Sequence, residues 1–126
     1  MGKEYSRSQR LAQLLKEEIS RLLRREVKDA RIGTVIVTDV EVTPDLKYAT
    51  VYVQVSGEDE REDETLEGLE SAAGFVRTRL GRELRIRRAP ELRFELDRTQ
   101  ERARRIHELL AQVEEVEEGE EGEAGE

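Results

Sequence analysis

The densest group of chemically capable side chains in this sequence is a run of arginines near the middle of the chain. An arginine guanidinium is planar and can donate two parallel hydrogen bonds, a geometry that matches phosphate oxygens. The helix macrodipole favours one or two cations at a helix C-terminus, but it does not account for six. The run therefore predicts a phosphate-binding surface. It contains one acid, Glu83, and the arginines Arg77, Arg79, Arg82, Arg85, Arg87 and Arg88.

The first thirty residues add to this basic character. Eight bases lie between Lys3 and Lys28, against four acids. Most of these bases lie on the face of a predicted helix that is opposite its apolar residues. Uncompensated bases neutralise phosphates, so both segments favour nucleic-acid binding over a solvated surface. An arginine bias from genome composition or heat adaptation is the alternative. The predicted RNA-binding residues are Arg7, Arg10, Lys16, Arg24, Arg77, Arg82, Arg85, Arg87 and Arg88.

The few aromatic residues indicate which kind of nucleic acid is bound. Single-strand platforms stack bases on exposed aromatic side chains. Phe75 and Phe94 fit core positions, which leaves only Tyr5, Tyr48 and Tyr52 as candidates for exposure. Base stacking is therefore disfavoured, and recognition of the backbone and shape of structured RNA fits better.

Residues for catalysis or metal binding are scarce. The chain has no cysteine, and its single histidine, His107, is not part of an HExxH motif. It contains no GxxxxGK[ST] phosphate loop and no serine in a nucleophile-elbow context. We interpret Asp39, Asp45 and Asp97 as solvated turn and strand-end acids. We therefore expect neither an enzyme nor a metal or cofactor site.

The net charge of −8 hides a basic body with two acidic segments. Residues 113–126 contain eight glutamates and no base, and residues 58–64 contain six acids and one base. The remainder carries 21 bases and 16 acids. No apolar run approaches the roughly 20 residues of a membrane span. The absence of cysteine fits a reducing, cytoplasmic setting.

Apolar periodicity predicts three helices. Apolar residues recur at three- and four-residue spacing over residues 7–28, 65–84 and 98–113. The chain beyond Val113 is low-complexity Glu and Gly, which buries too little apolar surface to fold. We therefore predict one domain over residues 1–112 and a disordered acidic tail over residues 113–126.

Alternation of apolar and polar residues predicts three strands, over residues 34–43, 46–55 and 91–97. A Pro44-Asp45 turn joins the first two into a hairpin. The element order predicts a single α+β domain, a three-stranded sheet with helices on one face and a further C-terminal helix. In the first strand, Asp39 and Glu41 are expected on one face, and on the other face Ile36, Thr38, Val40 and Val42.

This order of elements resembles the type II arrangement of KH RNA-binding domains. Such domains clamp the nucleic-acid backbone with a GxxG loop, but here GxxG occurs only in the acidic tail. Ala72-Ala73-Gly74 stands at the equivalent place in the second helix. This resembles the ribosome-binding factor A family, bacterial small-subunit assembly factors with a KH-like fold and an Ala-x-Gly helix kink in place of GxxG. Residues 38–49 and 74–94 also match the family pattern, although its Asp-Pro-Arg is Asp29-Ala30-Arg31 here.

The resemblance implies a protein that binds the small ribosomal subunit and its rRNA. It would assist late maturation of that RNA near its 5′ end and then leave before translation. The resemblance implies that the protein has no catalytic activity and no cofactor. It also implies a transient partner, an assembly GTPase that aids release. We expect a monomer. Two alternatives remain open. One is a general structured-RNA-binding protein of the same fold, and the other is a protein–protein adaptor that uses the hairpin edge or the last helix.

Overall fold

The first helix, α1 (Arg7–Arg25), is fixed at its start by a capping box. The Ser6 hydroxyl accepts from the Gln9 backbone N–H at 3.2 Å, and the Gln9 side chain accepts from the Ser6 N–H at 2.9 Å. These bonds satisfy backbone donors that a helix start leaves without partners. The apolar stripe then buries its members Leu15, Ile19, Leu22 and Leu23 against the sheet. This is a computed structural model that describes residues 6–55 and 61–124; Tyr5 and residues 58–60 of the acidic segment lie outside that range.

Strands β1 (Val35–Val42) and β2 (Tyr48–Val55) form the predicted antiparallel hairpin. The turn between them is built around Asp45, whose carboxylate accepts from the Thr43 hydroxyl at 2.6 Å and from the Lys47 N–H at 3.0 Å. Leu46 completes the turn with a φ of 64°. The turn therefore holds Lys47 and Tyr48 in a fixed position at one end of the sheet.

The prediction for the faces of β1 was wrong at Ile36. Val37 pairs with Val53 while Asp39 pairs with Tyr52, so Thr38 is an extra residue in a β-bulge. A bulge shifts the alternation by one residue, which puts Val37 and Val40 on the buried face. Ile36 is left 55% exposed on the other face, with Asp39 and Glu41.

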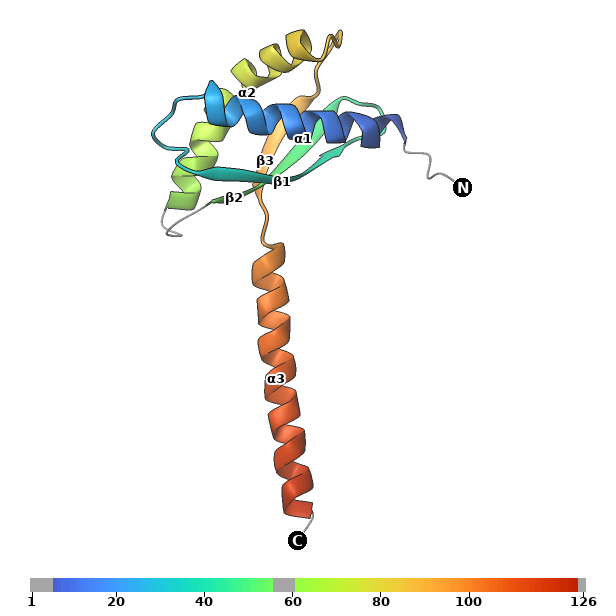
Figure 1. Ribbon diagram of the computed structural model, residues 1–126, viewed down its shortest axis with the longest axis vertical. Coiled ribbons are helices and arrows are strands. Elements are labelled where there is room, and N and C mark those ends of the chain that lie inside the picture. Colours follow the sequence, from blue (N-terminus) through green and yellow to red (C-terminus); the bar gives the residue numbers. More distant parts are fainter. Residues whose placement is uncertain (1–5, 56–60, 125–126) are drawn as a thin grey trace.

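Helix α2 (Glu62–Glu83) connects β2 to β3 (Glu91–Leu96), which pairs with β2 in parallel. The three strands form one sheet in the order β1-β2-β3. Figure 1 shows α1 and α2 stacked over one face of this sheet. The core between these layers includes Leu22, Val51, Leu80 and Phe94, and the α+β prediction is confirmed.

Helix α3 (Thr99–Ala124) projects away from the two-layer domain (Figure 1). It runs past Val113, where we expected the helix to end and a disordered tail to begin. Glutamate is a good helix former, and the glutamate-rich backbone beyond Val113 continues as a helix. Every side chain from Glu101 to Val116 is exposed. None of the described helices is long and apolar enough to cross a membrane.

Two glycines of α2 are expected to respond oppositely to alanine. A Cβ at Gly68 would lie 2.8 Å from Ile32 Cγ1 and 3.2 Å from Arg31 Cβ, whereas a Cβ at Gly74 meets nothing within 4 Å. We expect Gly68→Ala to destabilise the protein by about 1–3 kcal/mol through overpacking. Gly74→Ala should stabilise it by about 1 kcal/mol through helix propensity. Urea unfolding measures both, and equal changes in the two variants would contradict the packing.

Candidate nucleic-acid interface

The structure divides the basic side chains into those with carboxylate partners and those without. Arg79 pairs with Glu26 at 2.8 Å, joining α2 to the end of α1, and Arg98 pairs with Glu62 at 2.9 Å. Arg21, Arg31 and Arg104 also have partners. Among the side chains described, those of residues 6–55 and 61–116, none of the nine predicted RNA-binding residues has a carboxylate within 4.0 Å. Their charges are therefore available to phosphate.

The arginine run lies on the end of α2 and on the loop that leads to β3. Arg85 follows the helix C-cap Leu84 with a φ of 51°, a left-handed conformation that turns the chain out of the helix. The loop then carries Arg87 and Arg88 at the surface. Ala89 and Pro90 are buried beneath them and anchor the loop to the core. The cations are thus displayed on a fixed part of the backbone.

Two members of the run meet residues that the sequence did not identify as part of the site. Arg77 Nε donates to the Ala89 carbonyl oxygen at 3.0 Å, which holds the arginine against the loop. Arg77 and Arg88 line a hollow of about 350 Å³ together with Lys47 and Tyr48 of the hairpin. No local pattern signals Lys47 or Tyr48, because only the pairing of β2 with β3 brings the hairpin turn to this loop.

The predicted RNA-binding residues of α1 are spread along the helix. Arg7, Arg10 and Arg24 are exposed, and Lys16 is half-buried. At 1.5 Å per residue, Arg7 and Arg24 lie roughly 25 Å apart along the helix. The predicted interface is therefore extended, with one cluster at the α2–β3 loop and further cations along α1.

The predicted kink lies within a helix that is assigned without interruption from Glu62 to Glu83. Figure 1 shows that the axis of α2 changes direction between its green and yellow parts. The Thr78 hydroxyl donates to the Gly74 carbonyl oxygen at 3.0 Å, a bond that often accompanies helix bending. Assignment of the bend to Ala72, Ala73 and Gly74 stays a prediction.

The aromatic side chains differ from expectation in one case. Phe94 is 4% exposed and belongs to the core, as expected. Phe75 is 47% exposed on α2, so the prediction that it lies in the core was wrong. Phe75 directly precedes the buried Val76, so its side chain points off the apolar stripe of the helix. Tyr48 is 54% exposed, whereas Tyr52 is half-buried.

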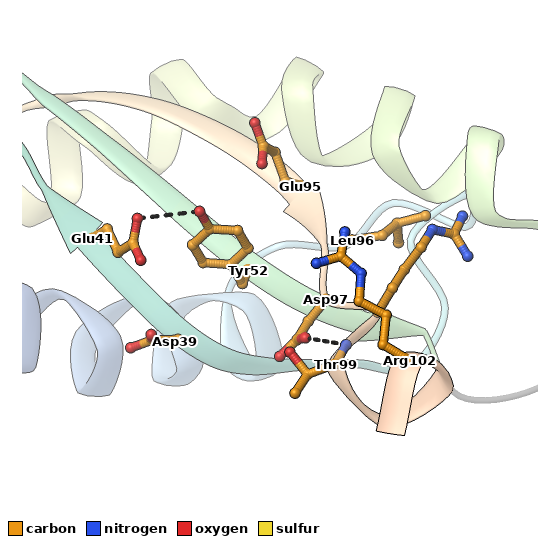
Figure 2. A pocket seen from close by; sticks show the side chains of 9 residues that line it. Asp39, Glu41, Tyr52, Glu95, Leu96, Asp97, Thr99 and Arg102 are labelled. Carbon is orange, nitrogen blue, oxygen red and sulfur yellow. Dashed lines mark hydrogen bonds between the residues drawn. The ribbon is translucent and has the colours of Figure 1, made fainter. Parts of the chain in front are cut away.

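The sheet face opposite α1 and α2 is acidic around Tyr52. Figure 2 shows Asp39, Glu41 and Glu95 around Tyr52. They line a hollow of about 370 Å³ that is bordered by Arg98, which precedes α3, and by Arg102 of α3. The Tyr52 hydroxyl donates to Glu41 at 3.2 Å. Three carboxylates on neighbouring strands repel phosphate. An RNA ligand is therefore expected at the loop and along α1, away from these three carboxylates.

Asp97, at the edge of the same hollow, has a structural role. Its carboxylate accepts from the Thr38 hydroxyl at 2.6 Å and from the Thr99 N–H at 2.8 Å (Figure 2 shows the latter). These hydrogen bonds lower the pKa of Asp97 below its usual value. They also fasten the start of α3 to the bulge in β1. Asp45 lies in the hairpin turn, so the three aspartates considered from the sequence do not form one cluster.

The protein is expected to lose stability in acid, because the carboxylates of Asp29 and Asp97 have lowered pKa values in the folded state. Arg31 lowers the pKa of Asp29 from 3.8 to about 2, and Asp97 is shifted in the same direction. A carboxylate whose pKa is lower in the folded state than in the unfolded state stabilises the protein at a pH above its unfolded-state pKa. This contribution is lost as the pH falls through the folded-state pKa. We expect Tm to drop between about pH 4 and pH 2, and Asp97→Asn to reduce that drop. Glu70→Gln, an exposed change on α2, is the control; an equal effect of both would contradict the assignment.

The comparison with known families rests on most of the chain. The model of the family described as ribosome-binding factor A matches residues 7–110. This range covers the three strands, α1, α2 and the first half of α3. The chain belongs to this family. The KH-like α+β fold expected from the element order is the fold of its solved members.

Named relatives agree with this assignment. Ribosome-binding factor A of Caldanaerobacter subterraneus subsp. tengcongensis is 46% identical over 114 residues, which cover 90% of this chain and 93% of that protein. The Dictyoglomus thermophilum factor is 50% identical over 101 residues, 79% of this chain and 84% of that protein.

Two structures of the Thermus thermophilus factor are similar to the fold described above. The crystal structure aligns with a TM-score of 0.66 at 27% identity and covers 73% of this chain and 97% of that chain. The coordinates of a homology model of that factor, fitted into the cryo-EM map of a complex of the 30S subunit with ribosome-binding factor A, align with a TM-score of 0.52 at 30% identity. They cover 67% of this chain and 92% of that chain.

Proposed function

We propose that this protein binds the small ribosomal subunit, or its precursor, through rRNA phosphates and assists late maturation of that RNA near its 5′ end. The observation that carries the proposal is the exposed cation cluster of the α2–β3 loop, whose arginines lack carboxylate partners among the described residues. Membership of a family of ribosome-binding factors and the 30S complex of the Thermus thermophilus relative support it.

The proposed mechanism is the ordering of two rRNA segments against a rigid surface. The loop cluster neutralises one segment, and the cations along α1 neutralise another. The carboxylates around Tyr52 direct both segments to the basic side. No bond is made or broken, so the protein acts as a non-enzymatic factor without a cofactor. We further propose that it acts as a monomer in the cytoplasm and that an assembly GTPase aids its release.

Co-sedimentation with purified small and large ribosomal subunits across a salt series tests this proposal. We expect saturable binding to the small subunit alone. With about five phosphate contacts, the slope of log affinity against log salt should be about −4. Equal binding to both subunits, or binding to neither, would contradict the proposal and leave a general RNA-binding protein or a protein–protein adaptor.

The glutamates after Val113 are proposed to weaken binding to non-specific RNA. Eight glutamates follow Val113, and they repel any RNA that does not also supply a specific surface. Deletion of residues 114–126 should therefore raise the affinity for random-sequence RNA several-fold at low salt. Fluorescence anisotropy measures this affinity. An unchanged value would leave the segment as a solubility tail.

A protein–protein adaptor is the second candidate, and α3 is the observation that favours it. Ile106, Leu109, Leu110, Val113 and Val116 are each more than half exposed along this helix. Such a stripe at helical spacing is suited to a groove on a partner protein. Leu109→Ser with Leu110→Ser distinguishes the candidates, since α3 exposes these residues and the domain does not depend on them. The rRNA proposal predicts unchanged small-subunit binding in this variant, and the adaptor predicts its loss.

A further inference from the structure

The hollow between the hairpin turn and the α2–β3 loop combines cations with an exposed aromatic ring. It is lined by Lys47 and Tyr48 from the hairpin, Arg77 from α2, and Arg88 from the loop. Its volume of about 350 Å³ is at the lower end of the range for small-ligand sites, which suits a single nucleotide better than a duplex.

Backbone contacts hold the three segments of this hollow together. The Glu91 N–H donates to the Lys47 carbonyl oxygen at 2.8 Å, and Tyr48 is the register partner of Glu91 in the parallel pair β2–β3. Arg77 Nε donates to the Ala89 carbonyl oxygen at 3.0 Å from the other side. The walls are therefore formed before any ligand arrives, which reduces the entropy that binding must overcome.

The charges in the hollow favour a phosphate next to a ring. Lys47, Arg77 and Arg88 have no carboxylate within 4.0 Å in the described part of the chain. One of the two acids on the rim, Asp45, already accepts from Thr43 and Lys47 in the turn. The other, Glu91, is exposed and can accept from the amino group of a base.

We propose that this hollow binds one unpaired nucleotide of RNA, with its base stacked on Tyr48 and its phosphate held by Lys47, Arg77 and Arg88. The proposal rests on the rRNA-binding function and adds a contact to a base. It changes the expectation from the sequence, which disfavoured stacking because few aromatic residues were candidates for exposure. Of the exposed aromatic residues described, Tyr48 lines a hollow with three cations, and Phe75 lines none of the hollows described here.

The experiment uses the full chain and two fluorescent hairpin RNAs that differ at one position. One RNA has a single bulged adenosine, and the other has an abasic residue at the bulge, which keeps the phosphate and removes the base. Anisotropy titrations at fixed salt should show tighter binding of the adenosine RNA. Tyr48→Ala should weaken binding of that RNA about 5- to 150-fold, the range for loss of one stacked base, and leave binding of the abasic RNA unchanged.

Three further variants separate stacking from folding and from charge. Tyr48→Phe keeps the ring and should bind as the wild type does. Phe75→Ala removes an exposed aromatic elsewhere on the surface and should preserve the preference for the adenosine RNA. Arg88→Gln should weaken both RNAs equally and make the slope of log affinity against log salt shallower by about 0.7 to 0.9.

Equal binding of the two RNAs by the wild type, or equal losses for both in Tyr48→Ala, would overturn the nucleotide site. Steep salt dependence and selective sedimentation with the small subunit would then persist, so the rRNA proposal would stand without it. The wild-type comparison of the two RNAs requires no substitution, so it decides the matter even if Tyr48→Ala does not fold.

Discussion

Replacement of Arg85, Arg87 and Arg88 by glutamine is expected to weaken binding to small ribosomal subunits about 100- to 500-fold at 0.1 M salt. Each lost phosphate contact changes the slope of log affinity against log salt by about 0.7 to 0.9. Over the tenfold range from 1 M to 0.1 M salt, this corresponds to a loss of affinity by a factor of about 5 to 8 per contact. Three independent contacts multiply to the stated range. All three side chains are exposed, and none has an ion-pair partner among the described residues, so the fold should be unaffected. Co-sedimentation or anisotropy across a salt series measures both quantities.

The matched control removes the same charge from a different surface. Arg102, Arg104 and Arg105 are exposed on α3, and their replacement by glutamine also lowers the net charge by three. We expect a loss of only a few-fold at 0.1 M salt, because these residues act at a distance that salt screens. Equal losses in the two triple variants would show that net charge, and not the α2–β3 loop, controls binding. Intact binding in the loop variant would favour the adaptor.

Leu15→Ala is expected to destabilise the protein by about 2–5 kcal/mol, while Leu14→Ala changes the free energy of unfolding by about 0.5 kcal/mol or less. Leu15 is 0% exposed between α1 and the sheet, so its truncation loses the transfer free energy of the side chain and leaves a cavity. Leu14 is 50% exposed on the same helix, where substitutions have small effects. A typical domain has about 5–15 kcal/mol of stability, so the first change removes a large part of it.

Urea unfolding monitored by circular dichroism measures both leucine variants under one set of conditions. The two substitutions remove the same atoms from adjacent positions of one helix, so helix propensity cancels from the comparison. Similar destabilisation by both would mean that α1 is rotated relative to the sheet. The loop cations would then require a new placement, because Arg79 of α2 pairs with Glu26 at the C-terminus of α1.

The sequence by itself determined the type and order of the elements. In α1 the spacing of Leu15, Ile19 and Leu22 creates an apolar stripe in a helix and in no other regular structure. In β3 the alternation of Leu92, Phe94 and Leu96 does the same for a strand. Both patterns depend on residues a few positions apart, so they can be interpreted without the rest of the chain. The arginine run and the family resemblance are local patterns of the same kind.

Only the tertiary structure decided which members of these patterns are buried and which residues form a site. Ile36 was expected on the face with Val40, but the bulge at Thr38 exposes it, and the bulge exists only in the pairing with β2. Leu14 and Leu15 belong to one apolar stripe, and the rotation of α1 on the sheet buries one of them.

The candidate site shows the same division between local and non-local information. Arg77 and Arg88 were predicted as RNA-binding residues from their type and spacing. Lys47 and Tyr48 were not, since they reach the hollow through the pairing of Tyr48 with Glu91, 43 positions along the chain. Periodicity encodes the conformation of a segment through its neighbours in sequence. Burial and site composition depend instead on contacts between distant segments, whose register is set by packing of the whole core.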